Sequence, residues 1–84
     1  MKITEAVLNK NFDAHVCQDI VVVANKYQSE ILICKGIQKA NVKSIMGVIS
    51  LMLKKGDNIL ISAKGDDSEQ ATKGMLEFGF FDVK

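Results

Sequence analysis

Residues 41–67 read NVKSIMGVISLMLKKGDNILISAKGDD, and this stretch decides the class of fold because it places a helix directly before a strand. Ser44 is a favourable N-cap, and seven of the nine residues from Ile45 to Leu53 are apolar, so the stretch predicts a short helix that stops at Gly56. In residues 58–64, Ile59, Ile61 and Ala63 fall on one face, which is typical of a half-buried antiparallel strand.

Toward the N-terminus, the chain predicts a strand and then a helix. Residues 2–8 (KITEAVL) favour a strand that ends in the polar loop Asn9–Asn11. From Asp13 onward, apolar residues recur at helical spacing as far as Tyr27, and the Asp13 carboxylate can accept hydrogen bonds as an N-cap. The β-branched run Val21–Val23 would also suit a strand, so the helix is inferred from periodicity and capping.

The remaining segments complete the order of elements. Residues 30–35 and 39–42 predict a hairpin, and Asp67 with Gln70 resembles a capping box for a last helix through about Phe78. The resulting order is βαββαβα, in which the apolar stripes of the helices must pack on the sheet. We therefore expect residues 1–84 to form one α+β domain, an open-faced β-sandwich with a four-stranded antiparallel sheet and three helices on one face.

Composition narrows the functional classes. Eleven basic and ten acidic residues give a net charge of +1, so the chain has no broad positive field to attract nucleic acid. No apolar run is long enough to span a bilayer, so we expect a cytoplasmic protein without membrane insertion. Cys17 and Cys34 are interpreted as reduced packing residues, and with His15 as the single histidine we expect no metal site.

The segment Asn41–Leu51 resembles the regulatory-serine motif of the HPr family, the histidine-containing phosphocarrier proteins of the bacterial sugar phosphotransferase system. The similarity continues without a gap through residues 54–67, and Ala24–Tyr27 resembles the end of the family's first helix. The resemblance therefore extends over roughly residues 2–78. It implies the same open-faced sandwich and a phosphoacceptor that enzymes act on.

One family motif is altered in this chain. In HPr proteins the loop before the first helix reads G-[IL]-H-A-R-P, and its histidine carries phosphate from the phosphoenolpyruvate-dependent first enzyme to sugar-specific permease components. The gapless comparison places Asp13 at the histidine, Ala14 at the alanine, His15 at the arginine and Val16 at the proline. The Asp13 carboxylate would occupy the amide donors of the helix N-terminus and repel a phosphoryl dianion. We therefore expect ordinary histidine phosphotransfer to be lost.

Other interpretations of the altered site remain open. In the plainest of them, Asp13 is only an N-cap and His15 is an exposed residue of the first turn. His15 could instead be a displaced phosphate acceptor, but sliding the motif by two residues would turn the apolar stripe of the helix by about half a turn. A third interpretation makes Asp13 an acyl-phosphate acceptor.

Ser44 is the second candidate site. A serine at an N-cap needs no regulatory role. The resemblance implies, however, that an HPr kinase phosphorylates Ser44, as in HPr from low-GC Gram-positive bacteria. A phosphate there would lie at a helix N-terminus, which tolerates a dianion. The helix after Ser44 has more apolar residues than one face can bury. We expect Ile45, Met46 and Ile49 to form an exposed partner-binding patch, and a fully packed core helix is the alternative.

Three functions are compatible with these features. The first is a regulatory HPr-like protein of carbon catabolite regulation, phosphorylated on Ser44 and bound by the kinase or a transcriptional regulator. The second is a working phosphocarrier that uses His15 and is served by the first enzyme of the system, and the third is a protein-binding domain that is never phosphorylated. None of them needs a cofactor, and the absence of a Walker loop or a paired nucleophile argues against an independent enzyme. The altered motif favours the regulatory role.

Overall fold

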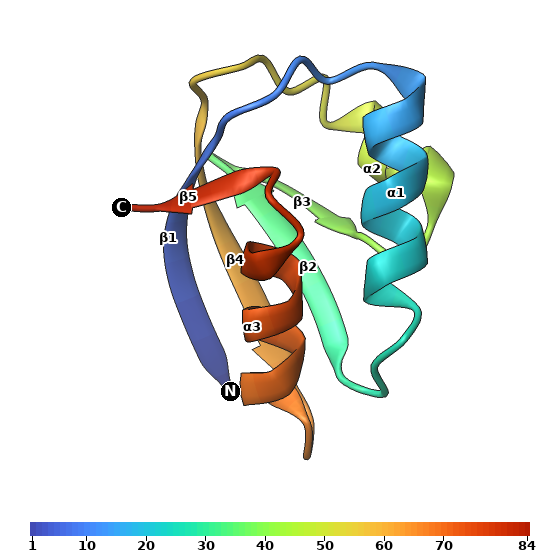
Figure 1. The fold of residues 1–84 in the computed structure, drawn as a ribbon, viewed down its shortest axis with the longest axis vertical. Helices are drawn as coiled ribbons and strands as arrows, with labels where there is room; N and C mark the ends of the chain where they lie inside the picture. The colour runs from blue at the N-terminus through green and yellow to red at the C-terminus, as the bar shows by residue number, and fades with distance from the viewer.

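The computed structural model describes all 84 residues and contains one five-stranded antiparallel sheet with three helices. In chain order the elements are β1 (Lys2–Leu8), α1 (Ala14–Ala24), β2 (Glu30–Lys35), β3 (Gln38–Asn41), α2 (Ile45–Ser50), β4 (Asn58–Lys64), α3 (Ser68–Glu77) and β5 (Phe81–Val83). The strands lie side by side in the order β3-β2-β4-β1-β5. Figure 1 shows the sheet with the helices gathered on one side of it.

The two faces of the sheet follow from the alternation of side chains along the strands. Ile31 and Ile33 of β2 and Ile59 and Ile61 of β4 are buried, whereas the residues between them are exposed or half-buried. The buried face and the helices share one cluster of 20 buried hydrophobic residues. The predicted α+β sandwich with an open sheet and three helices is therefore confirmed.

The structure adds a fifth strand that the sequence did not indicate. Gly79, with φ of 97°, follows α3, and β5 then pairs with β1 so that Phe81 lies opposite Leu8. Phe80 and Phe81 are both buried. A strand of three residues is too short to show alternation, which explains why only four strands were expected.

Three predicted boundaries differ from the structure. The first helix, expected as far as Tyr27, ends at Ala24, and Asn25 is its C-cap. The strand expected at residues 39–42 is Gln38–Asn41, although the Val42 N–H still donates to the Ile31 carbonyl at 3.0 Å. The helix expected through Leu53 ends at Ser50, because Met52 takes a left-handed backbone with φ of 48°. This turn buries Leu53 and leaves Met52 76% exposed.

The predicted capping box at Asp67 and Gln70 is wrong. The Asp67 side chain makes no hydrogen bond with the first turn of α3. Its carboxylate accepts hydrogen bonds from the Ser29 hydroxyl, from the Ser29 N–H at 2.8 Å and from the Gln28 N–H at 2.9 Å, and these bonds hold the pKa of Asp67 below its usual range. Asp67 therefore ties the loop before β2 to the loop before α3.

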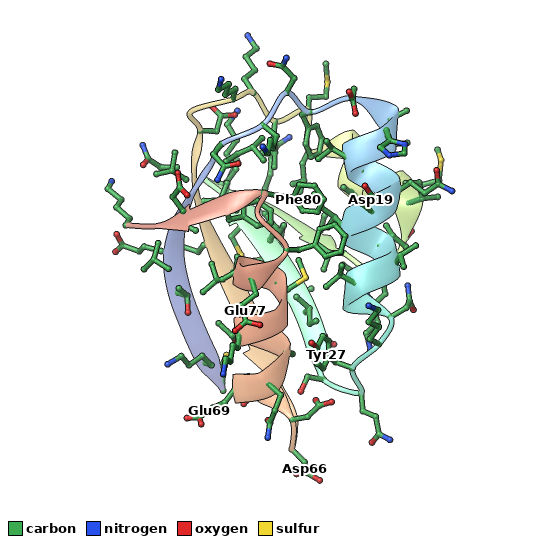
Figure 2. The ribbon with its side chains drawn as sticks, viewed as in Figure 1. Asp19, Tyr27, Asp66, Glu69, Glu77 and Phe80 are labelled. Carbon is green, nitrogen blue, oxygen red and sulfur yellow. The ribbon has the colours of Figure 1, made fainter.

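Gly74 lies within α3, where glycine is unfavourable, and packing explains its presence. A Cβ atom at Gly74 would overlap the ring of Tyr27. Figure 2 shows Tyr27 in the turn after α1, on the side that faces α3. The glycine thus lets α1 and α3 approach each other over the sheet.

Candidate functional site

The N-terminus of α1 carries the altered motif. Asp13 has extended backbone angles, and its Oδ1 accepts a hydrogen bond from the Val16 N–H at 2.9 Å. Its carbonyl oxygen accepts from the Cys17 N–H at 3.0 Å, which starts the helix. The predicted N-cap is confirmed, and the carboxylate occupies a first-turn donor that an anion would otherwise use.

Asp13 and Val16 form a matched pair. In the pattern G-[IL]-H-A-R-P, the position of Val16 holds proline, which has no N–H to donate. Replacement of this proline by valine supplies the very N–H that the Asp13 carboxylate accepts. If the gapless comparison with the family motif holds, the two replacements are linked by this hydrogen bond, which caps α1.

His15 projects from the first turn of α1 into solvent. Its side chain is 83% exposed, and Nε2 lies 3.6 Å from Oδ2 of Asp19 one turn further along the helix. Figure 2 shows Asp19 on α1. Asp19 thus places a carboxylate beside the single histidine, and its negative charge disfavours a phosphoryl dianion there.

We expect Asp13→Ala to lower the free energy of unfolding by about 1 kcal/mol because the cap of α1 is lost. Asp13→Asn should retain most of the stability, since the amide oxygen can accept the same bond. Urea denaturation measures both. The control is Asp66→Ala, because Asp66 is an exposed loop residue. An equal loss of stability at Asp13 and Asp66 would show that the cap contributes little.

Ser44 is the exposed N-cap of α2, as the sequence predicted. Its Oγ accepts from the Gly47 N–H at a long 3.4 Å, and its carbonyl accepts from the Val48 N–H at 3.0 Å. The neighbouring Lys43 is engaged elsewhere, because its Nζ donates to the Tyr27 carbonyl at 2.6 Å. The Ser44 hydroxyl is therefore only weakly held and open to solvent.

The apolar residues after Ser44 are exposed, so α2 is not a fully packed core helix. Ile45 is 38% exposed, Met46 71% and Ile49 45%, and Val48 is the one buried residue of α2. Met52, which the sequence analysis did not select, continues this surface beyond the helix end. The structure leaves the partner-binding role of the patch as a proposal.

The patch continues onto α1 as a groove. A hollow of about 400 Å³ and another of about 450 Å³ lie between the two helices, and Ala14 and Ile49 line both. We define the α1–α2 groove by seven lining residues: Phe12, Ala14, Cys17, Val22, Ile45, Ile49 and Met52. The contribution of α1 was not predicted from the sequence. Val22 is exposed but stands next to the buried Val23 in one run of valines, so the sequence does not distinguish the two.

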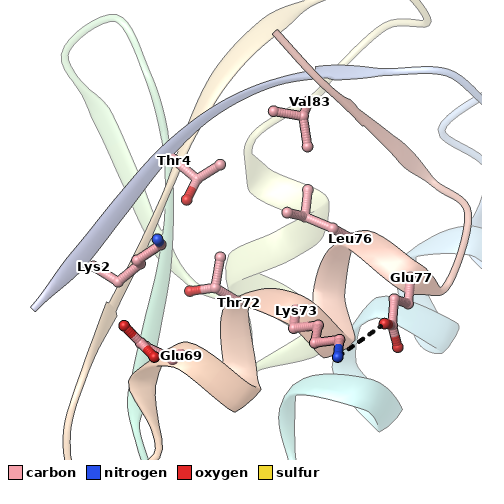
Figure 3. Close-up of a pocket in the computed structure, with 8 residues that line it drawn as sticks. All are labelled: Lys2, Thr4, Glu69, Thr72, Lys73, Leu76, Glu77 and Val83. Carbon is pink, nitrogen blue, oxygen red and sulfur yellow. Dashed lines mark ion pairs between the residues drawn. The ribbon is translucent and has the colours of Figure 1, made fainter.

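A further hollow of about 540 Å³ lies between β1 and α3, and none of its lining residues belongs to α1 or α2 (Figure 3). It is lined largely by polar and charged side chains, and Lys73 and Glu77 form an ion pair at 3.8 Å. None of the residues selected from the sequence lines it. No group of three or more His, Cys, Asp and Glu side chains is placed to hold a metal ion. Cys17 and Cys34 are both free cysteines. None of the helices is long and apolar enough to cross a membrane.

The structure has the open-faced α+β sandwich that the resemblance to the HPr family implied, with Asp13 and Ser44 as the N-caps of its first two helices. A family model described as "PTS HPr component phosphorylation site" matches residues 4–79. The HPr-like protein Crh of Halalkalibacterium halodurans is 35% identical over 77 residues, 92% of each chain, and Crh of Bacillus subtilis is 30% identical over 74 residues, 88% of this chain and 87% of that protein. The crystal structure of HPr-C-His from Thermoanaerobacter tengcongensis has a TM-score of 0.86 at 36% identity, with 93% of this chain and 90% of that chain covered.

The chain belongs to the HPr family of the phosphotransferase system. The resemblance inferred from Asn41–Leu51 is thereby confirmed. Relatives include proteins named phosphocarrier, such as HPr of Mycoplasma pneumoniae, which is 43% identical over 58 residues, 64% of this chain and 66% of that protein. Relatives of both kinds are similar to this chain, so its own residues must distinguish a regulatory role from a carrier role.

Proposed function

We propose that this chain is a cytoplasmic regulatory HPr-like protein, phosphorylated on Ser44 and not on histidine. The observation that carries the proposal is the hydrogen bond from the Val16 N–H to the carboxylate of Asp13, the residue that the gapless comparison aligns with the family's phosphohistidine. A carboxylate in this place holds the donor and adds negative charge, so the site is a poor acceptor of a phosphoryl group. The similarity to two proteins named HPr-like protein Crh supports the same conclusion.

Ser44 is suited to a kinase. The hydroxyl is exposed and only weakly bound to the Gly47 N–H, so phosphorylation displaces no strong contact. A phosphate would lie at the N-terminal end of α2, where free amides favour an anion. The fold would therefore keep its shape while the charge next to the α1–α2 groove changes.

The α1–α2 groove supplies the docking surface for the kinase and for a transcriptional regulator. Most of its residues are exposed and apolar, and Met52 in the groove and Met46 beside Ser44 add two exposed methionines to this surface. Such a surface suits a partner that inserts apolar side chains. Phosphorylation would add a dianion at the rim, which favours a partner with arginine or lysine beside its apolar anchor. In this role the chain is a substrate and an adaptor, and it catalyses no reaction of its own.

Incubation with ATP and an HPr kinase should add one phosphate to the chain, measured as an intact-mass increase. Ser44→Asn should abolish the increase, because asparagine keeps the N-cap but has no hydroxyl. The asparagine variant separates loss of the acceptor from melting of α2, which circular dichroism checks. A phosphate that persists in Ser44→Asn would assign the acceptor to another residue and refute this part of the proposal.

A further inference from the structure

The face of the sheet that no helix covers carries an apolar centre. Ile3 is 59% exposed and Leu60 39%, and Leu32 and Cys34 are half-buried. In the strand register, Leu60 lies directly opposite Cys34, whereas Ile3 and Leu32 flank Ser62 one step further along. Diagonal neighbours in a sheet are within reach of long side chains, so the four residues form one patch around Leu60. We call this patch and its charged rim the open face.

Charged residues border the patch in an ordered way. One row across β3, β2, β4 and β1 reads Lys39, Cys34, Leu60 and Glu5. Lys39 and Glu5 thus stand at opposite ends of the row, three strand spacings or about 14 Å apart. At the end of the patch nearer the start of β2, Glu30 of β2 lies opposite Lys64 of β4. In the first row the positive charge is on β3 and the negative charge on β1, and in the second row the negative charge is on β2 and the positive charge on β4.

We propose that the open face binds a second copy of this chain. A twofold axis along the strands, midway between β2 and β4, places β3 of one copy over β1 of the other and β2 over β4. Lys39 then faces Glu5 of the second copy, and Glu30 faces Lys64 of the second copy. Every charge at the ends of these two rows meets its opposite, and Cys34 and Leu60 meet in the centre.

The dimensions suit this arrangement. Sheets that pack face to face are about 10 Å apart, a gap that a lysine and a glutamate can bridge from opposite sides. The Lys84 N–H donates to the Glu5 carbonyl at 3.1 Å, so Lys84 lies beside Glu5 at the outer edge, beyond the four strands that overlap. The α1–α2 groove lies on the other side of the sheet, so both copies can still bind a regulatory partner.

Charge-swap variants test the dimer in analytical ultracentrifugation of the full chain at low salt with reducing agent. The wild type should reach twice the 9.2 kDa mass of the chain as its concentration rises. Glu5→Lys should weaken the association by about tenfold or more, because it sets lysine against Lys39 of the second copy. Glu5→Lys combined with Lys39→Glu should restore it, since the two changes together recreate opposite charges across the axis.

Glu69→Lys is the control, because it changes the net charge by the same amount at an exposed residue of α3, on the side of the sheet that the helices cover. It should leave the association within about twofold of the wild type. A chain that stays monomeric at all concentrations overturns the proposal. A dimer that is insensitive to Glu5→Lys, or that the double variant fails to restore, also overturns it and assigns the contact to another surface.

Discussion

Gly65→Ala is expected to lower the free energy of unfolding by about 3 kcal/mol, a large part of the stability of so small a domain. Gly65 has φ of 149°, a conformation that side chains rarely adopt, and a Cβ there would lie 2.7 Å from Ser29 Oγ and 2.9 Å from Ser29 Cα. Ser29 is buried and donates its N–H and hydroxyl to Asp67. The methyl group would therefore disturb the contact that joins the two loops.

The control for this substitution is Gly36→Ala. Gly36 also has a positive φ, of 61°, but nothing lies within 4 Å of a Cβ placed there. Its replacement should cost only about 1 kcal/mol from backbone strain. Urea denaturation of both variants measures the difference. Equal losses would mean that Ser29 and Asp67 move aside freely and that the loop contact adds little.

Ile49→Asp is expected to slow phosphorylation of Ser44 by HPr kinase by about thirtyfold or more. This factor corresponds to about 2 kcal/mol, the binding energy that is typically lost when a central apolar residue of an interface is replaced. Ile49 lines both hollows of the α1–α2 groove and is 45% exposed. Because it is not in the core, the variant should still fold, and thermal unfolding followed by circular dichroism checks this.

Ile37→Asp is the matched control, because Ile37 is fully exposed in the turn between β2 and β3 and lines neither hollow of the groove. The initial rate of phosphate incorporation at subsaturating substrate gives kcat/KM for each variant. The Ile37 variant should match the wild type. If the two variants lose activity to the same degree, the kinase does not dock in the α1–α2 groove.

Much of the fold could be predicted because its signals are local. The alternation in residues 58–64 and the caps at Asp13 and Ser44 each depend on a few neighbouring residues, and the structure has β4, α1 and α2 in those places. The end of α2 could not be predicted in the same way. Burial of Leu53 depends on the left-handed backbone of Met52, which is set by tertiary packing.

Long-range contacts explain the other differences. Asp67 has the sequence signature of a cap, yet its carboxylate binds Ser29, which is 38 residues away in the chain. β5 exists because Phe81 pairs with β1 near the opposite end of the sequence. Neither partner can be recognised from the local pattern.

The candidate site was predicted in its parts but not in its assembly. Ser44 followed from its N-cap position and the family motif, and the exposed residues of α2 followed from the apolar excess of one short segment. The groove needs α1 as well, and only the packed structure brings Ala14 next to Ile49. The hydrogen bond between Asp13 and Val16 likewise became evident only from the geometry of the structure.

The measurement that tests the central claim most directly is intact-mass spectrometry after incubation with phosphoenolpyruvate and the first enzyme of the phosphotransferase system. An HPr protein with the usual histidine motif, treated in parallel, verifies that the donor enzyme is active. The account predicts that this chain keeps its unmodified mass, because the proposal puts a carboxylate, Asp13, at the acceptor position and the Asp19 carboxylate lies beside His15. A gain of one phosphate that His15→Ala abolishes would contradict the account and make the chain a working phosphocarrier.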